Sequence, residues 1–268
     1  MKSIAIIVKE QIENKHMIWN LAKYELNNKY ASNALGSAWL LLNPLIQIGL
    51  FWFVFGLGIR GGGPVGDIPF IVWLLAGIIP WFYVSGAISS GATSINQKLN
   101  VASKMNFPLS IIPTYVLISE LLIHAILLTF IPISMLIFGV NFTGFNILRL
   151  FYSIFTTTIF LTALAYVTST VTSIVKDLNL LIQHIVRLTM WMTPIMWQSV
   201  GTGRMYRFIL MLNPVYYLIS GYRTAFLYSN TASINLRHSL YFWTVTLVLL
   251  MIGTRIHIKF RREFIDYL

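Results

Sequence analysis

The sequence contains no cysteine and only eight acidic residues among 268. The first absence excludes a disulfide framework, a thiol nucleophile and any metal site built on cysteine. The second leaves no cluster of carboxylates that could hold a metal or act as an acid–base pair. No Gly-Lys pair occurs, so the chain has no P-loop for ATP. We therefore expect no catalytic residues, no metal and no cofactor site in this chain, and no enzymatic activity of its own.

Charge is scarce as well. Charged residues make up 10% of the chain, hydrophobic residues make up 57%, and the mean hydropathy is +0.73. A soluble domain carries about 25% charged residues, so this chain could not cover a water-exposed surface. The apolar residues also form long runs. We predict an all-α integral membrane protein with a single membrane domain.

The apolar runs predict six transmembrane helices within a domain covering residues 36–268. Residues 1–35 alternate charged and apolar positions at helical spacing, which predicts an amphipathic helix lying on the cytoplasmic membrane surface. The six expected spans are 38–58, 69–91, 110–139, 147–174, 178–199 and 239–256.

Two further segments are too polar or too interrupted to be straight spans. Residues 93–108 carry two lysines and end at a proline, which predicts a short cytoplasmic amphipathic helix. Residues 204–228 are apolar but contain three arginines and the Asn213-Pro214 break. A central arginine costs about 2.5–3.5 kcal/mol in a membrane helix. We therefore predict a pair of re-entrant helices before the last span.

The net charge of +11 has two interpretations. Binding of nucleic acid would require a basic stripe on a polar fold. With six spans, 12 of the 19 lysines and arginines instead fall on one side, including all nine lysines, and six fall on the other. This asymmetry predicts that both termini are cytoplasmic. We expect membrane lipids, and no nucleic acid, as partners.

One apparent motif fails its context test. The run from Gly56 to Gly61 matches the dinucleotide pattern G-x-G-x-x-G. That pattern requires a preceding strand and a following helix, whereas here it closes an apolar span. We interpret it as a turn.

Two charges are expected within the membrane. Glu120 and Arg187 each lie about ten residues into a predicted span, or about 15 Å deep at ~1.5 Å per residue. Buried ionisable groups pair with one another or line a water-filled path. We hypothesise a Glu120–Arg187 ion pair that joins the third and fifth spans.

Polar side chains recur on one face of the first and fifth spans. This spacing is typical of helices that line a conduit, and equally of helices that bond to each other in the bundle. Aromatic residues lining such a conduit would suit sugar rings. The residues that we assign to a substrate path are Trp39, Asn43, Gln47, Phe51, Trp81, Arg187 and Trp191.

Several stretches of this layout resemble the permease subunits of ABC exporters of the polysaccharide-export type. The local matches are closest to the wall teichoic acid translocation permeases of Gram-positive bacteria. The matching stretches are Tyr30 to Pro44 (YASNALGSAWLLLNP), Phe53 to Arg60 (FVFGLGIR), Ser103 to Tyr115 (SKMNFPLSIIPTY) and Leu212 to Tyr217 (LNPVYY).

The resemblance implies a homodimeric channel in the cytoplasmic membrane, bound to two copies of a separate ATPase subunit that holds ATP and Mg. It implies transport of an undecaprenyl-linked anionic glycopolymer, wall teichoic acid in a Gram-positive bacterium, with O-antigen or capsular polysaccharide as the alternative. Residues 1–35 would form the interface helix, and 93–108 the coupling helix that docks on the ATPase. The expected coupling residues are Gln97, Lys98, Lys104, Met105, Asn106 and Phe107.

Two other classes remain. A membrane-embedded transferase would need an acidic or histidine-containing motif at the membrane face, and none is present. A secondary transporter would need inverted repeats and intramembrane carboxylates, whereas Glu120 stands alone and no repeat is visible.

Overall fold

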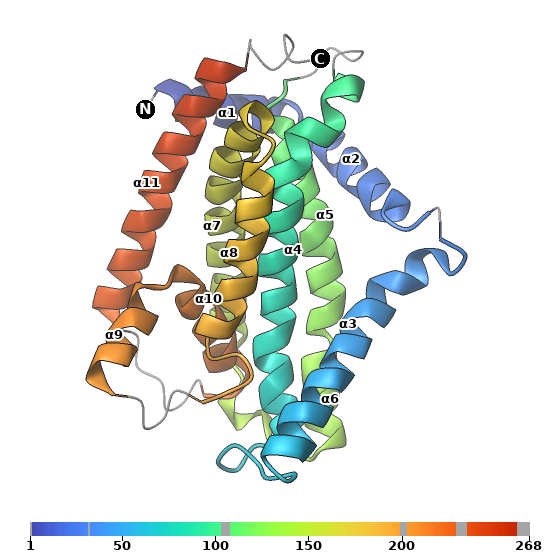
Figure 1. Cartoon of the computed structure of the whole chain (residues 1–268), viewed down its shortest axis with the longest axis vertical. Coiled ribbons are helices and arrows are strands. Elements are labelled where there is room, and N and C mark those ends of the chain that lie inside the picture. Colours follow the sequence, from blue (N-terminus) through green and yellow to red (C-terminus); the bar gives the residue numbers. More distant parts are fainter. Residues whose placement is uncertain (1, 32, 103–107, 199–202, 229–234, 262–268) are drawn as a thin grey trace.

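The computed structural model describes residues 2–31, 33–102, 108–198, 203–228 and 235–261, and in these ranges its regular secondary structure is helical apart from one isolated bridge between Val65 and Ile68. The predicted all-α class is confirmed for this part of the chain (Figure 1). The elements are α1 Lys2–Glu13, α2 Lys15–Asn28, η1 Gly36–Ala38, α3 Trp39–Phe51, η2 Trp52–Ile59, α4 Phe70–Ala102, α5 Ile111–Leu128, α6 Phe130–Ile137, η3 Phe142–Gly144, α7 Ile147–Ile174, α8 Leu178–Met192, α9 Arg204–Leu212, α10 Pro214–Phe226 and α11 Leu236–Phe260.

Five segments of the described chain are long and apolar enough to cross a membrane, so this is a multi-pass membrane protein. They are Gly36–Ile59, Phe70–Leu99, Ile111–Ile137, Ile147–Ile174 and Leu236–Phe260. Each overlaps a predicted span, and the bounds 147–174 agree at both ends.

The fifth predicted span, 178–199, is not confirmed as one helix. It begins as α8, which runs beside α4 (Figure 1) but has only 15 residues, or about 22 Å against a hydrocarbon core of ~30 Å. The helix ends because Thr193 is extended and Pro194 follows it; a residue before proline is driven away from helical geometry.

Helix α4 is the central element of the bundle. It contacts α5, α7, α8 and α10, and 72% of its most apolar window is buried. Small residues allow the close approach: a Cβ added to Gly91 would lie 3.2 Å from the Cβ of Ala165 on α7. Small residues thus let α4 and α7 pack closely at this position.

The N-terminal region differs in detail from the single amphipathic helix that we predicted. It forms two helices, α1 and α2, with a break at Asn14, whose side chain donates to the carbonyl of Glu10. Ile18 and Ala22 of α2 are buried against Ile111 and Tyr115 of α5. α1 and the last turns of α11 lie at the same end of the bundle (Figure 1), where Glu10 and Arg261 form a 2.7 Å ion pair.

The segment 93–108 also requires a correction. Residues 93–102 are not a separate cytoplasmic helix but the last turns of α4, which continues unbroken to Ala102. The polar positions here do not interrupt the helix because Asn96 donates to the Thr172 carbonyl and Lys98 pairs with Glu25.

Residues 204–228 form two helices that break at the predicted place. Asn213 caps α10 by accepting a hydrogen bond from the Val215 amide, and Pro214 occupies the first turn, where its missing N–H costs nothing. α10 packs against α4 and α7. Their re-entrant character stays a prediction.

Candidate functional site

A cavity of about 470 Å³ lies between α3 on one side and α4 and α5 on the other. Helix α3 inclines away from the bundle (Figure 1), and only 11% of its most apolar window is buried. Beyond the adjoining η1 and η2, its main contact is with α4, and between the two a space remains where polar and aromatic side chains meet. The residues that line this cavity include Lys29, Tyr30, Asn43, Gln47, Trp81 and Glu120.

The wall of this cavity holds an ion pair. Lys29 follows the last residue of α2, and its Nζ donates to Glu120 Oε1 on α5 at 2.7 Å. The Glu120 side chain is 8% exposed, whereas that of Lys29 is 34% exposed. Glu120 fits beside α4 because Gly86 has no side chain: a Cβ there would lie 3.0 Å from Glu120 Oε2. A buried carboxylate would carry a large desolvation cost without such a partner.

The predicted Glu120–Arg187 pair is therefore wrong. Among the described residues, the ion-pair partner of Glu120 is Lys29, and Arg187 lies exposed on α8. Glu120 and Arg187 lie at similar depths along their predicted spans, but depth alone does not show which side chains meet. Lys29 reaches Glu120 because α2 packs so that the chain after it lies beside α5.

An aromatic cluster backs the cavity. His124 stacks on Tyr83 at 4.7 Å between ring centroids, and its Nε2 is 3.0 Å from the hydroxyl of Tyr222. Tyr83 in turn shares a hydrogen bond with Thr158 of α7 at 3.2 Å. These contacts join α4, α5, α7 and α10 behind the cavity, and α3 takes no part in them.

The structure brings together some of the predicted substrate-path residues. Asn43, Gln47 and Trp81 all line the cavity beside Glu120. Trp39 and Phe51 are half-buried on α3 and are not among the lining residues. The assignment of all these side chains to a substrate path stays a prediction.

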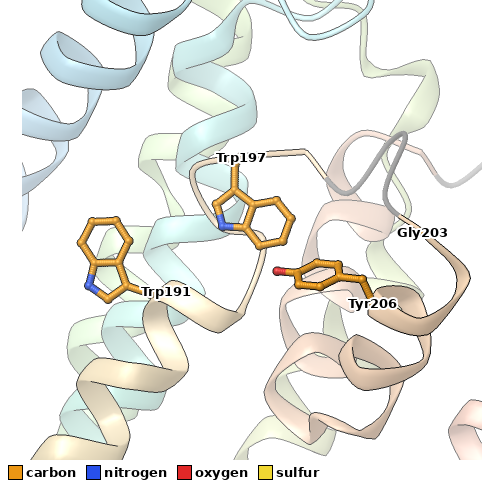
Figure 2. Close-up of a pocket in the computed structure, with 4 residues that line it drawn as sticks. All are labelled: Trp191, Trp197, Gly203 and Tyr206. Atoms are coloured by element: carbon orange, nitrogen blue, oxygen red, sulfur yellow. The ribbon is translucent and has the colours of Figure 1, made fainter.

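Arg187 and Trp191 lie apart from that cavity on α8. Trp191, which is 57% exposed, borders a second hollow of about 480 Å³ with Trp197, Gly203 and Tyr206. Figure 2 shows the rings of Trp197 and Tyr206 turned toward each other, with Trp191 at the end of α8; the Trp197 and Tyr206 centroids are 5.7 Å apart.

An arginine holds the chain that follows α8. Arg223 of α10 donates from Nη1 to the Pro194 carbonyl and from Nη2 to the Ile195 carbonyl, the latter at 2.6 Å. Its guanidinium lies 3.7 Å from the centroid of Trp73. Gly77 leaves the space, since a Cβ there would lie 2.5 Å from Nη2. Arg223 thus satisfies two carbonyls that the Pro194 break left without helical donors.

The coupling residues are only partly described. Gln97 is exposed and Lys98 is bonded to Glu25 near the end of α4. Lys104, Met105, Asn106 and Phe107 lie outside the described residues. The coupling role stays a prediction.

Sequence reasoning missed Lys29, Tyr30, Trp197, Tyr206 and Arg223 as members of these sites. A signal existed for Arg223, because an arginine in an apolar helix must find acceptors inside the protein. For Lys29 none existed, because a lysine at a predicted membrane surface needs no partner.

A comparison with protein families identifies the general class. The family model described as ABC-2 type transporter matches residues 16–227. The chain belongs to the ABC-2 type transporter family. The match runs from α2 through α10 and so includes both hollows and the Arg223 contacts.

Curated relatives of this ABC-2 protein are named O-antigen export system permease proteins. The relative from Myxococcus xanthus is 22% identical over 82% of this chain and 84% of its own length. One from Klebsiella pneumoniae is 23% identical over 91% and 92%, respectively. Another from Klebsiella pneumoniae is 22% identical over the same shares. The names of these relatives agree with O-antigen, our alternative polymer, better than with teichoic acid.

Proposed function

We propose that this chain is the membrane permease subunit of an ATP-driven exporter that moves a lipid-linked surface polysaccharide across the cytoplasmic membrane. The observation that carries the proposal is the ABC-2 match over residues 16–227, together with relatives named O-antigen export permeases that align over most of the chain. The polar cavity supports it, because polar groups inside a membrane bundle mark paths for polar solutes.

The polymer has two candidates. An O-antigen-type glycan is favoured by the names of the relatives. An undecaprenyl-linked wall teichoic acid is favoured by the stretches between Tyr30 and Pro44 and between Phe53 and Arg60, which resemble the teichoic acid permeases of Gram-positive bacteria. Both are long glycans on a lipid carrier, so the same machine serves either.

Energy would come from a separate ATPase subunit, in two copies, which binds ATP and Mg. We place the end of α4 and residues 103–107 against that subunit, with α1, α2 and both termini on the same cytoplasmic side. The common location of α1 and the end of α11 is consistent with this orientation (Figure 1).

We further propose that two copies of the chain form the conduit, with α3 and α8 facing it or facing each other. Both helices carry exposed apolar side chains, for example Ile46 at 60% and Leu188 at 61%. They also carry the exposed polar side chains of Gln47 and Arg187. A face with an arginine and an amide is poorly suited to lipid tails, which favours a second copy or a water-filled path.

Depletion of the chain in its host tests the export function. The surface polysaccharide should disappear while lipid-linked glycan accumulates in the membrane, because synthesis continues without export. Loss of wall phosphate would identify teichoic acid, and loss of a phosphate-free glycan would identify the O-antigen type. Normal surface glycans after depletion would contradict the proposal.

The coupling segment has its own test. Changing Met105, Asn106 and Phe107 together to alanine should leave membrane insertion intact, abolish export and separate ATP hydrolysis from transport. Export at the wild-type rate would rule out this segment as the contact with the ATPase.

The dimer can be tested with introduced thiols, because the chain has no cysteine of its own. L188C on α8 should give a cross-linked dimer in membranes under oxidation. I252C on α11, which is 47% exposed, is the matched control and should not. Cross-linking by I252C alone would place the dimer contact on α11 instead.

A further inference from the structure

The second oxygen of Glu120 has no visible partner. Oε1 accepts from Lys29 at 2.7 Å, whereas Oε2 accepts no hydrogen bond from the described residues of the chain. It faces Gly86 of α4, where an added Cβ would lie 3.0 Å away and no side-chain donor is present. A charged carboxylate can accept about four hydrogen bonds, so Oε2 keeps acceptor capacity that the described residues do not use. The carboxylate lines a cavity, so a donor could reach it from there.

The facing wall of the cavity supplies uncommitted amides. Asn43 and Gln47 are one helical turn apart on α3 and both line the cavity. Asn43 donates to the Tyr30 hydroxyl at 3.5 Å, the limit of a hydrogen bond. Within the described ranges the Gln47 amide forms no hydrogen bond. Each amide offers two donor hydrogens and an acceptor oxygen, so this wall can both give and accept hydrogen bonds.

An aromatic ring lies on the same side of the cavity as Glu120. Trp81 of α4 lines the cavity and is 4% exposed. The cavity volume, about 470 Å³, falls within the ~300–1,000 Å³ typical of small-molecule sites. An indole, two amides and a carboxylate together match a molecule that has an apolar face and a rim of hydroxyl groups. A pyranose ring has both features.

Charge selects among the possible ligands. The positive charge of Lys29 is directed at Glu120, so the pair is close to neutral as a whole. A phosphate in this cavity would meet the buried carboxylate as a like charge, whereas a neutral sugar hydroxyl would donate to it. The site therefore favours an uncharged sugar over the phosphate groups of a polymer or lipid carrier.

We propose that the cavity between α3, α4 and α5 binds one uncharged sugar unit of the exported glycan. Glu120 accepts from ring hydroxyls, Asn43 and Gln47 bond the opposite rim, and Trp81 packs on the apolar face. Lys29 is a positioning residue that holds the Glu120 side chain in place through their ion pair. The proposal rests on the function in polysaccharide export given above. Helix α3 is the least buried wall of the cavity, since only 11% of the most apolar window of Gly36–Ile59 is buried.

The test uses full-length protein in lipid nanodiscs and a fluorescently labelled oligosaccharide released from the surface polysaccharide of the host. Binding is followed by fluorescence polarisation. The E120Q and Q47L variants should each weaken binding about tenfold or more, since each removes hydrogen bonds worth about 1.4 kcal/mol or more. Gln47 is exposed and forms no bond within the described residues, so Q47L tests the site even if E120Q fails to fold.

E13Q is the matched control for E120Q. Glu13 also pairs with a lysine, Lys9 at 3.7 Å, but its side chain is 58% exposed on α1, away from the cavity. Oligosaccharide binding by E13Q should equal that of the wild type. The second probe is glycerol phosphate, which should not compete with the oligosaccharide.

Equal oligosaccharide affinity of wild type, E120Q and Q47L would overturn the site. If glycerol phosphate competes with the oligosaccharide in the wild type but not in K29M, the cavity is a phosphate site. That result would overturn the choice of a sugar as the ligand. No binding by the wild type, combined with loss of export on depletion, would refute the site while export stands. Normal surface glycans on depletion would refute the export function itself, whatever the binding result.

Discussion

Helix α4 and the helical segment Gly36–Ile59, which contains α3, are both long and strongly apolar, yet they pack in opposite ways. Their most apolar windows have the same mean hydropathy, 1.9, but 72% of that window is buried in Phe70–Leu99 and only 11% in Gly36–Ile59. The hydropathy of each segment therefore indicates that it prefers a membrane, but it does not indicate which helices pack against it. The difference comes from small residues and polar contacts that hold α4, such as Gly77 beneath Arg223 and Gly86 beside Glu120.

Helix α4 and its neighbours α5, α7 and α10 form a scaffold, whereas α3 and α8 present exposed polar side chains. In the scaffold, a buried polar group such as His124 is bonded through Nε2 to the Tyr222 hydroxyl of another helix. On α3 and α8, polar groups such as Gln47 and Arg187 are exposed in the single chain. A chain that had only to be stable in lipid would place such groups inside the bundle. The exposed polar groups are thus best explained by what the protein binds or moves.

The largest effect is expected at Arg223 in the scaffold. R223A removes the donors to the Pro194 and Ile195 carbonyls and should cost about 2–5 kcal/mol, because each orphaned buried acceptor costs ~1–3 kcal/mol. The thermal stability of detergent-purified protein, followed by size-exclusion chromatography after heating, measures it. R237A, at an exposed arginine of α11, should behave as wild type. Equal stability of the two variants would show that the Arg223 contacts do not hold the segment.

A smaller loss is expected at Gly253, where α11 meets α7. In G253A the new Cβ would lie 2.9 Å from the Tyr166 Cβ and 3.1 Å from the Ala163 carbonyl oxygen. Overpacking of this kind costs about 1–3 kcal/mol. The same heating assay should show a lower midpoint than wild type. An unchanged midpoint would mean that α7 and α11 accommodate the added methyl group, and that their contact is less tightly packed than these distances indicate.

Much of the scaffold could be predicted from the sequence. The span 147–174, the helical break at Asn213-Pro214 and the small-residue packing of α4 follow from local rules on hydropathy, proline and glycine. The sequence failed where the outcome depended on packing between distant segments. The early end of α8 did carry a signal, because Pro194 follows Thr193 in the sequence, but the apolar residues beyond it hid the break.

The candidate site was predictable only in part. The spacing of Asn43 and Gln47 indicated a polar face on α3, and the depth of Glu120 indicated a buried charge. The partner of Glu120 could not be read in the same way. Lys29 reaches it only because α2 packs along α5 and leads the chain there, a tertiary arrangement that the periodicity of α2 does not contain.

Arg187 tests whether the exposed face of α8 faces lipid or a conduit. If it faces a conduit, R187L should keep the fold and reduce export about tenfold, equivalent to roughly 1.4 kcal/mol of lost stabilisation of the moving glycan. Surface glycan measured in cells at matched protein levels gives the result. R187L that exports normally and is more stable than wild type would show that α8 faces lipid.

The smallest effect is expected at Gly49 on α3, the counterpart of Gly253 on α11. A Cβ at Gly49 would have no heavy atom within 4 Å, so G49A should not clash. Alanine is favoured over glycine inside a helix by up to ~1 kcal/mol, so the variant should be equal to or slightly more stable than wild type in the heating assay.

If a second copy packs closely on this face of α3, the Cβ added at Gly49 would meet it. G49A would then lower the yield of L188C cross-linked dimer without affecting the stability of the single chain. A loss of stability in monodisperse monomer would instead mean that α3 packs against the bundle more closely than its 11% burial indicates, and the contrast between α3 and α4 would fail.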